Sequence, residues 1–278
     1  MKKFILWFLA IVITLSAAVY QRMTGPTYPK RISVSVNNTV HELKLVRSLS
    51  LAEKSEVRLD LNDSTVRANL FFKRYRSDGE YQVAEFVYRA TPEHGEFFAD
   101  IPQQPVAGKL AYYIEIIDKN GSQLYFKESP VVIRFKGDVP AFVLVPHILL
   151  MFIAMLFSTL AGLMAAIKYP MYKKYAFWTL ILFIAGGMVL GPIVQFFAFG
   201  DFWTGIPFGW DLTDNKTLIA LIFWILAVAM NRKKERPLYT ILAAVVLLLV
   251  FSIPHSLFGS ELNYSSGQVT QGIILNFF

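Results

Sequence analysis

The sequence predicts an α+β membrane protein with an N-terminal transmembrane anchor, an extracytoplasmic antiparallel β-sandwich and a C-terminal four-helix transmembrane bundle. Three observations lead to this prediction. Five apolar runs approach or exceed the length of about 20 residues that a helix needs to cross the hydrocarbon core. A long polar segment with the alternating pattern of short strands separates the first two runs. Short basic clusters flank the runs, which is typical of cytoplasmic loops.

The apolar runs account for a mean hydropathy of +0.45 and for a hydrophobic content of 55%. They are Phe4–Tyr20, Phe142–Ile167, Tyr175–Phe197, Leu218–Met230 and Leu238–Ile253. The fourth run is short for a crossing, but the polar turn before it can lengthen the helix. The five runs together predict contact with a lipid bilayer.

The net charge of +7 is concentrated beside the apolar runs rather than spread over one surface. The clusters are Lys2-Lys3, Lys168 with Lys173-Lys174, and Arg232-Lys233-Lys234 with Arg236. Five crossings place all three clusters on the same side, as short cytoplasmic basic loops require. We therefore expect a protein of the bacterial inner (plasma) membrane with a cytoplasmic N-terminus, and we do not expect a nucleic-acid partner.

Residues 1–20 have a basic start, an apolar stretch and the small residues Ser16-Ala17-Ala18, which also fits a cleaved signal peptide. We interpret the segment as a retained anchor because the small-residue site is imperfect. Residues 21–30 contain Gly25, Pro26 and Pro29, and they form a linker.

Residues 31–137 contain many short runs with β-branched or alternating residues, which predicts an antiparallel sandwich. Turn signals at Ser77–Glu80 and Asp118–Gly121 separate some of these runs. The stretch Lys109–Gly121 (KLAYYIEIIDKNG) resembles the late hairpin of immunoglobulin-like modules. His41 and His94 fall in this domain, where we expect solvated strand or turn residues.

Residues 138–255 form the predicted membrane domain, and residues 256–278 form an external tail. The third run carries Gly186-Gly187 and Gly191-Pro192, so we expect a weakened or kinked outer half there.

The stretch Phe199–Thr217 (FGDFWTGIPFGWDLTDNKT) breaks the helical pattern and predicts an external loop. Trp203 and Trp210 suit the membrane–water boundary. His147 and His255 lie near the outer ends of two runs, on the side of this loop. Two neutral imidazoles at similar depth can bind one haem iron from both faces. The alternative is that both histidines are interfacial residues bonded to nearby carbonyls or to water.

The acidic residues of the loop allow two interpretations. Asp211, Thr213 or Asp214 can cap the N-terminus of the helix that follows, without any chemistry. Alternatively, Asp201, Asp211 and Asp214 can bind a divalent metal together with a histidine, although no metal-site spacing supports this. Lys216 is expected to be a boundary residue whose ammonium reaches water.

The stretch 199–228 resembles the tryptophan-rich (WWD) loop of the haem-handling membrane proteins of cytochrome c biogenesis. Phe199–Trp203 matches the aromatic-Gly-x-aromatic-Trp part of that motif, and Trp210-Asp211 matches its Trp-Asp part. Lys216 and Trp224 follow at about the places where the family has a lysine and a tryptophan. The chain departs from the family because TGIPFG separates its tryptophans, and because the family usually has more spans and no large sandwich after the first one.

The resemblance implies a haem b held at the outer face by His147 and His255 as ligands of the iron. It also implies that Trp203, Trp210 and Asp211 lie beside the haem. The expected function is haem handling in cytochrome c assembly, or electron transfer, with the sandwich docking a cytochrome or another subunit.

The alternative function is that of a cofactor-free accessory or scaffold subunit, whose β-sandwich binds a partner protein in a larger membrane complex. The chain has no cysteine, which excludes disulfides, thiolate metal sites and covalent c-type haem attachment. The middle of the apolar runs lacks carboxylates and lysines, which argues against a transporter. No nucleophile–histidine–carboxylate pattern indicates an enzyme.

Overall fold

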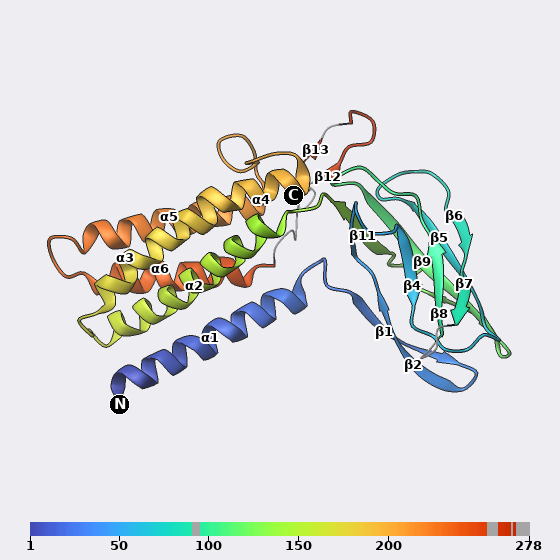
Figure 1. Cartoon of the computed structure of the whole chain (residues 1–278), viewed down its shortest axis with the longest axis horizontal. Helices are drawn as coiled ribbons and strands as arrows, with labels where there is room; N and C mark the ends of the chain where they lie inside the picture. The colour runs from blue at the N-terminus through green and yellow to red at the C-terminus, as the bar shows by residue number, and fades with distance from the viewer. Residues whose placement is uncertain (91–94, 255–260, 268, 271–278) are drawn as a thin grey trace. The chain divides into compact units, whose positions relative to one another are not determined.

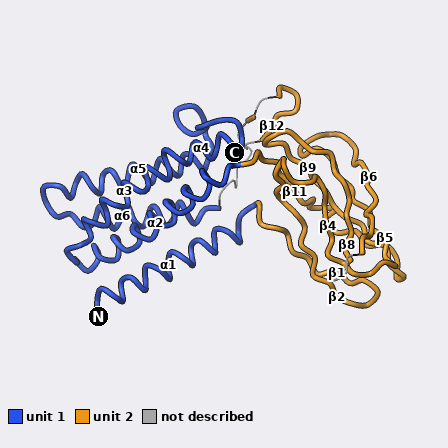
Figure 2. The backbone as a smooth tube through the Cα atoms, viewed as in Figure 1, with its two compact units in different colours: residues 1–26, 139–260, 271–278 blue, residues 27–138, 261–270 orange. Residues whose placement is uncertain are grey.

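The computed structural model describes residues 1–90, 95–254, 261–267 and 269–270, and these form two compact units (Figures 1 and 2). The helical unit contains described residues 1–26 and 139–254, and the β unit contains 27–138 with 261–270. The predicted α+β class is confirmed at this level: an apolar N-terminal helix, a β-rich middle and several apolar helices.

The strands of the β unit form three sheets besides a short terminal pair. They are β1 (Lys30–Val36), β2 (Thr39–Leu45), β3 (Ser48–Ser50), β4 (Glu56–Leu59), β5 (Arg67–Arg74), β6 (Gln82–Glu85), β7 (Val87–Ala90), β8 (Gly95–Asp100), β9 (Lys109–Asp118), β10 (Gly121–Tyr125), β11 (Val131–Lys136), β12 (Glu261–Leu262) and β13 (Val269–Thr270). The largest sheet has the order β3-β11-β9-β5-β6, with β10 also paired to β9, and the others are β4-β8-β7 and the β1-β2 hairpin.

All three sheets contribute to one hydrophobic core. Leu43 of the hairpin, Leu59 of the small sheet and Ile114 of the large sheet are each fully buried in the same cluster. Alternate residues of β5 are buried, as expected for strands with one face toward a core. The pairing is antiparallel except for β3 and β11, which run parallel.

The two turn signals lie where the sequence predicts them. Asp118 and Gly121 are paired across the β9–β10 hairpin, so its loop is Lys119-Asn120. The segment Ser77–Glu80 lies between β5 and β6, which pair antiparallel.

Part of the C-terminal segment returns to the β unit. The Lys109 ammonium lies 3.0 Å from the Glu261 carboxylate, and both side chains are largely buried. The Leu262 N–H donates to the Ala107 carbonyl at 3.0 Å, and the Tyr264 hydroxyl accepts from the Lys109 N–H at 3.1 Å. Within the predicted tail 256–278, the described residues 261–267 and 269–270 therefore belong to the β unit.

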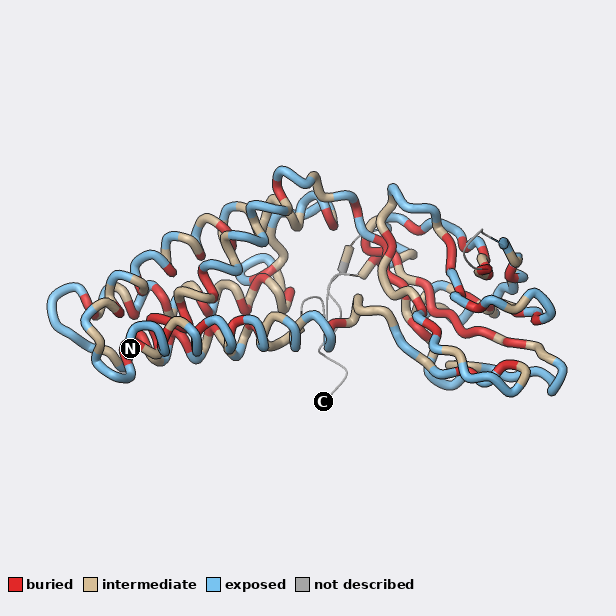
Figure 3. Tube along the Cα trace, turned by 60° about the horizontal axis from the view of Figure 1, so that its bottom comes forward, coloured by how far each residue is buried: buried red, intermediate tan, exposed pale blue. Residues whose placement is uncertain are grey.

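The helical unit consists of α1 (Lys2–Thr24), α2 (Ala141–Ala166), α3 (Tyr172–Phe183), the π-helix η1 (Ile184–Leu190), α4 (Gly191–Phe199), α5 (Leu212–Met230) and α6 (Pro237–Ser252). Four segments among the described residues are long and apolar enough to cross a membrane: α1, α2, the continuous α3–η1–α4 segment, and α5. The fifth predicted crossing, α6, is apolar but shorter. Buried and exposed residues alternate along these helices (Figure 3), so each has a packed side and an exposed apolar side.

The helix α1 packs against α2 rather than standing alone. The Trp7 ring lies edge-on to the rings of Phe157 and Tyr175, at centroid distances of 6.2 and 5.7 Å. The hydroxyls of Thr14 and Thr159 lie 3.5 Å apart in the buried contact between the two helices.

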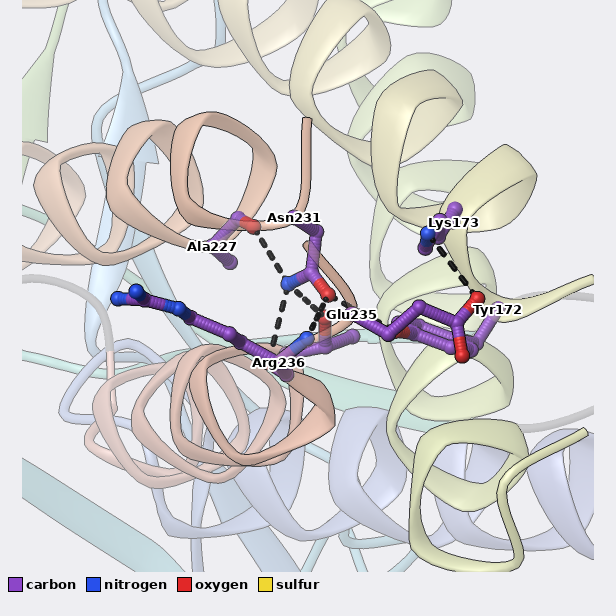
Figure 4. A network of polar contacts seen from close by, with 7 residues as sticks. Tyr172, Lys173, Ala227, Asn231, Glu235 and Arg236 are labelled. Carbon is purple, nitrogen blue, oxygen red and sulfur yellow. Dashed lines mark hydrogen bonds and ion pairs between the residues drawn. The ribbon is translucent and has the colours of Figure 1, made fainter. Parts of the chain in front are cut away.

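A buried asparagine fixes the turn between α5 and α6 (Figure 4). The Asn231 side-chain oxygen accepts from the Tyr172 hydroxyl and from the Arg236 N–H, each at 2.8 Å. Its amide nitrogen donates to the carbonyls of Ala227 and Arg236 at 2.8 and 3.1 Å, and it lies 3.3 Å from the Thr240 hydroxyl. Every hydrogen-bonding group of this amide therefore has a partner, and the turn is joined to α3.

The basic clusters lie at one end of the helical unit, which we call the basic end (Figure 1). An ion pair of 3.0 Å joins Lys173 of α3 to Glu235 of the α5–α6 turn. Leu6 of α1 shares a buried cluster with Met164 and Tyr172, so the start of α1 lies at this end too. The opposite end, which we call the loop end, carries the segment 200–211 between α4 and α5.

Candidate functional site

The segment at the loop end is a folded structure held from within by Asp214. The Asp214 carboxylate is 5% exposed and accepts from the Thr204 N–H at 2.6 Å and from the Thr204 hydroxyl at 3.2 Å. It also accepts from the Gln195 amide at 3.1 Å, which connects the loop to α4. Asn215 accepts from the Ile206 N–H at 2.8 Å. The first turn of α5 therefore anchors the loop that precedes it.

Asp211 is the N-cap of α5, as one of the two interpretations of the acidic residues predicts. One oxygen of its carboxylate accepts from the N–H groups of Thr213 and Asp214 at 2.8 and 3.2 Å. These bonds satisfy donors that the first helical turn otherwise leaves unpaired. The described residues contain no group of three or more His, Cys, Asp or Glu that could hold a metal ion. The structure therefore gives the divalent-metal interpretation no support.

The outer surface of the loop is strongly apolar. Phe208 is 81% exposed and Trp210 is 72% exposed, and Phe202 and Ile206 are also exposed. The rings of Phe202 and Phe196 stack with their centroids 4.3 Å apart, so the apolar surface continues onto α4. The carboxylates of Asp211 and Asp214 thus lie inside the loop end, and large apolar side chains lie outside.

The two tryptophans of the predicted site have different environments. The Trp203 indole N–H donates to the Ile206 carbonyl at 3.1 Å, which makes Trp203 part of the loop's internal framework. Trp210 is exposed beside the buried cap Asp211.

His147 is half-buried in the second turn of α2, and its ring is held by the π-helix. Its Nδ1 lies 2.9 Å from the Gly186 carbonyl. A carbonyl can only accept, so Nδ1 carries the proton, and Nε2 of the neutral ring keeps its lone pair. Histidines that bind metals usually have this arrangement, because the bond to a carbonyl fixes both the tautomer and the ring orientation.

Glycine in η1 makes this contact possible. A Cβ at Gly186 would lie 3.0 Å from the Leu150 Cβ and 3.0 Å from the Met151 sulfur, so a side chain there would push α2 away. A Cβ at Gly187 would lie 3.3 Å from the Thr217 methyl group on α5. The sequence predicts a weakened helix at these glycines, and the structure has a π-helix there.

The burial of Lys216 differs from what the sequence predicts. The sequence predicts that its ammonium reaches water, but the side chain is 2% exposed and donates to the Ile253 carbonyl at 2.8 Å. Ile253 follows the last residue of α6, so the ammonium lies at the negative end of that helix.

His255, the second predicted iron ligand, lies outside the described residues, as does His94. The other predicted site residues lie in three places. Trp210 and Asp211 are neighbours at the start of α5, and Trp203 lies within the loop. The His147 ring is bonded to η1. The bonds from Gln195 and Thr204 to the buried Asp214 are not part of the predicted site, because only the folded loop brings them together.

No protein-family model matches the chain, and none of the curated proteins matches it significantly.

Replacing Asp214 with alanine is expected to loosen the loop. The change removes the carboxylate that accepts from the Thr204 N–H, while the Gln195 amide keeps the Thr204 hydroxyl as an acceptor. Losing the acceptor of one buried donor costs about 1–3 kcal/mol. Limited proteolysis of the purified protein should show faster cleavage within 199–217 and a lower melting temperature. The matched control is Asp201→Ala, which removes an exposed carboxylate from the same loop. Equal cleavage rates for the two variants would show that Asp214 does not anchor the loop.

Proposed function

We propose that this chain is an integral membrane protein that binds haem b at the loop end of the helical unit, with His147 as one axial ligand. The observation that supports this most directly is the bond between His147 Nδ1 and the Gly186 carbonyl, because it leaves Nε2 with its lone pair. The aromatic side chains of the loop offer flat apolar surface suited to a porphyrin, and Trp210 is the most accessible tryptophan there. His255 is the proposed second ligand.

These residues fit the group. Imidazole is a good ligand for haem iron, and the chain needs no cysteine to hold haem b. A bound haem would supply one-electron chemistry, and the protein would set its potential through the axial ligands and the burial of the porphyrin. The proposed role is haem handling in cytochrome c assembly, or electron transfer with an external cytochrome.

The proposed topology has the basic end in the bacterial cytoplasm and the loop end outside. Two observations support this topology. The Lys173–Glu235 ion pair joins the α2–α3 connection to the α5–α6 connection, so both lie at the same end of the helical unit. The start of α1 packs near Tyr172 at that end. Short basic loops stay cytoplasmic. In this topology the β unit, which we propose is an immunoglobulin-like module, is extracytoplasmic and available to a partner protein.

The absorbance spectrum of the full-length protein tests this function. Protein purified in mild detergent from haem-replete cells should show a Soret band and, after reduction, the sharp visible bands of a six-coordinate haem b. Absence of a Soret band, both as purified and after addition of haemin, would contradict the proposal.

A second candidate is the cofactor-free accessory subunit. The exposed apolar surface of the loop, with Phe208 and Trp210 at its outside, favours this role because exposed aromatic clusters are common at the centres of protein interfaces. Purification with a stoichiometric partner and without pigment would support this candidate over the first.

A further inference from the structure

Lys216 has an unusual electrostatic position. Its side chain is 2% exposed, and its ammonium donates to one carbonyl, that of Ile253, at 2.8 Å. It also lies 5.9 Å from the centre of the Phe251 ring. An ammonium has three N–H donors and a full positive charge. The negative end of α6 and the attraction of Asp211 offset part of that charge, but only one of the three N–H donors has a hydrogen-bond partner among the described residues. Burying a charge that is only partly compensated is costly.

The nearby acidic residues offset its charge only in part, because Asp211 attracts the ammonium without forming an ion pair with it. Among the described residues, no carboxylate lies within the 4.0 Å ion-pair distance of Lys216. Asp211 and Asp214 lie on the preceding turn, but their oxygens accept N–H groups from the loop and from the first turn of α5. The positive end of α5 already offsets their charge.

Lys216 is bonded to the end of α6, and its neighbour Thr217 lies against the part of η1 that holds His147. Its partner Ile253 precedes His255 by two residues in the sequence. Its neighbour Thr217 faces Gly187, which follows the residue whose carbonyl holds His147. The buried ammonium therefore lies at the level of the helical unit where the haem is proposed to bind.

We propose that Lys216 is the cationic partner of a haem propionate. This inference rests on the proposed haem-binding function and adds which part of the ligand the protein recognises. A carboxylate would accept the N–H donors that Ile253 leaves unused and would compensate the charge in a medium of low dielectric constant. Charge-assisted hydrogen bonds of this kind are about twice as strong as neutral ones.

The experiment compares two ligands on the purified full-length chain: haemin, and haemin with both propionates converted to methyl esters. Soret titrations give the affinity for each. For the wild-type protein we expect haemin to bind about tenfold or more tightly than the diester, since a charged hydrogen bond is worth at least that factor. In Lys216→Met the haemin affinity should fall to the level of the diester, with the diester affinity unchanged.

The matched control is Lys174→Met, which removes an exposed lysine at the basic end and should keep the wild-type preference. Equal affinity of the wild-type protein for both ligands would overturn the inference while leaving haem binding intact. Equal weakening of both ligands in Lys216→Met would also overturn it, because Lys216 would then act only by positioning the end of α6. If the methionine variant does not fold, Lys216→Gln replaces it. Failure of the wild-type protein to bind either ligand would contradict the proposed function itself.

Discussion

Replacing His147 with alanine is expected to remove at least nine-tenths of the haem that co-purifies with the protein, as a roughly tenfold or greater loss of the Soret band. Removal of one axial ligand eliminates an iron–nitrogen bond that the aromatic surroundings cannot supply. The loss should be reversible in part, because added imidazole can occupy the space of the missing ring and ligate the iron. The measurement is the absorbance ratio of the Soret band to the protein band, with and without imidazole.

The control for this variant is His41→Ala. His41 is a half-buried strand residue of β2 in the β unit, so its loss should leave the pigment unchanged. If His147→Ala retains the full band, or if His41→Ala loses as much, His147 is not an iron ligand.

Replacing Asn231 with aspartate is expected to be the most destabilising of the single changes considered for the helical unit. The new carboxylate would put an oxygen where the amide donates to the carbonyls of Ala227 and Arg236, and it would bury a charge beside them. Breaking a buried polar network in this way costs about 3–5 kcal/mol. Thermal unfolding in detergent should show a large decrease in melting temperature.

The matched control is Lys173→Met, which breaks the ion pair with Glu235 at the same end. That pair is largely exposed, with side chains 37% and 70% accessible, so its loss should cost less than about 1 kcal/mol. Equal melting temperatures for the Asn231 and Lys173 variants would show that the buried amide does not hold the turn.

Much of the fold follows from local patterns in the sequence. The alternation in segments such as β5 predicts strands, and the Asp118–Gly121 signal predicts the hairpin turn, because both depend on neighbouring residues only. The fourth apolar run is lengthened through its polar turn to Leu212, because Asp211 supplies a cap there. The helix α6 has 16 residues, the same length as the apolar run Leu238–Ile253 that predicts it, and it is shorter than the four longer apolar segments.

The contacts of the candidate site could not be predicted from local sequence patterns. The bond from His147 to Gly186 depends on how closely α2 approaches η1, and the burial of Lys216 depends on where α6 ends. Both are tertiary contacts between segments far apart in the sequence, and residue spacing does not specify them. The sequence pattern at the start of α5 predicts that Lys216 lies at a boundary, but it does not show that the end of α6 lies over this side chain.

The central claim is that the helical unit binds haem b through His147. The most direct measurement is the haem content of wild-type protein from haem-replete cells, together with the electron paramagnetic resonance spectrum of the oxidised pigment. We expect about one haem b per chain and a low-spin signal from two imidazole ligands. A colourless protein that stays colourless with haemin, or a high-spin signal unaffected by His147→Ala, would contradict the claim.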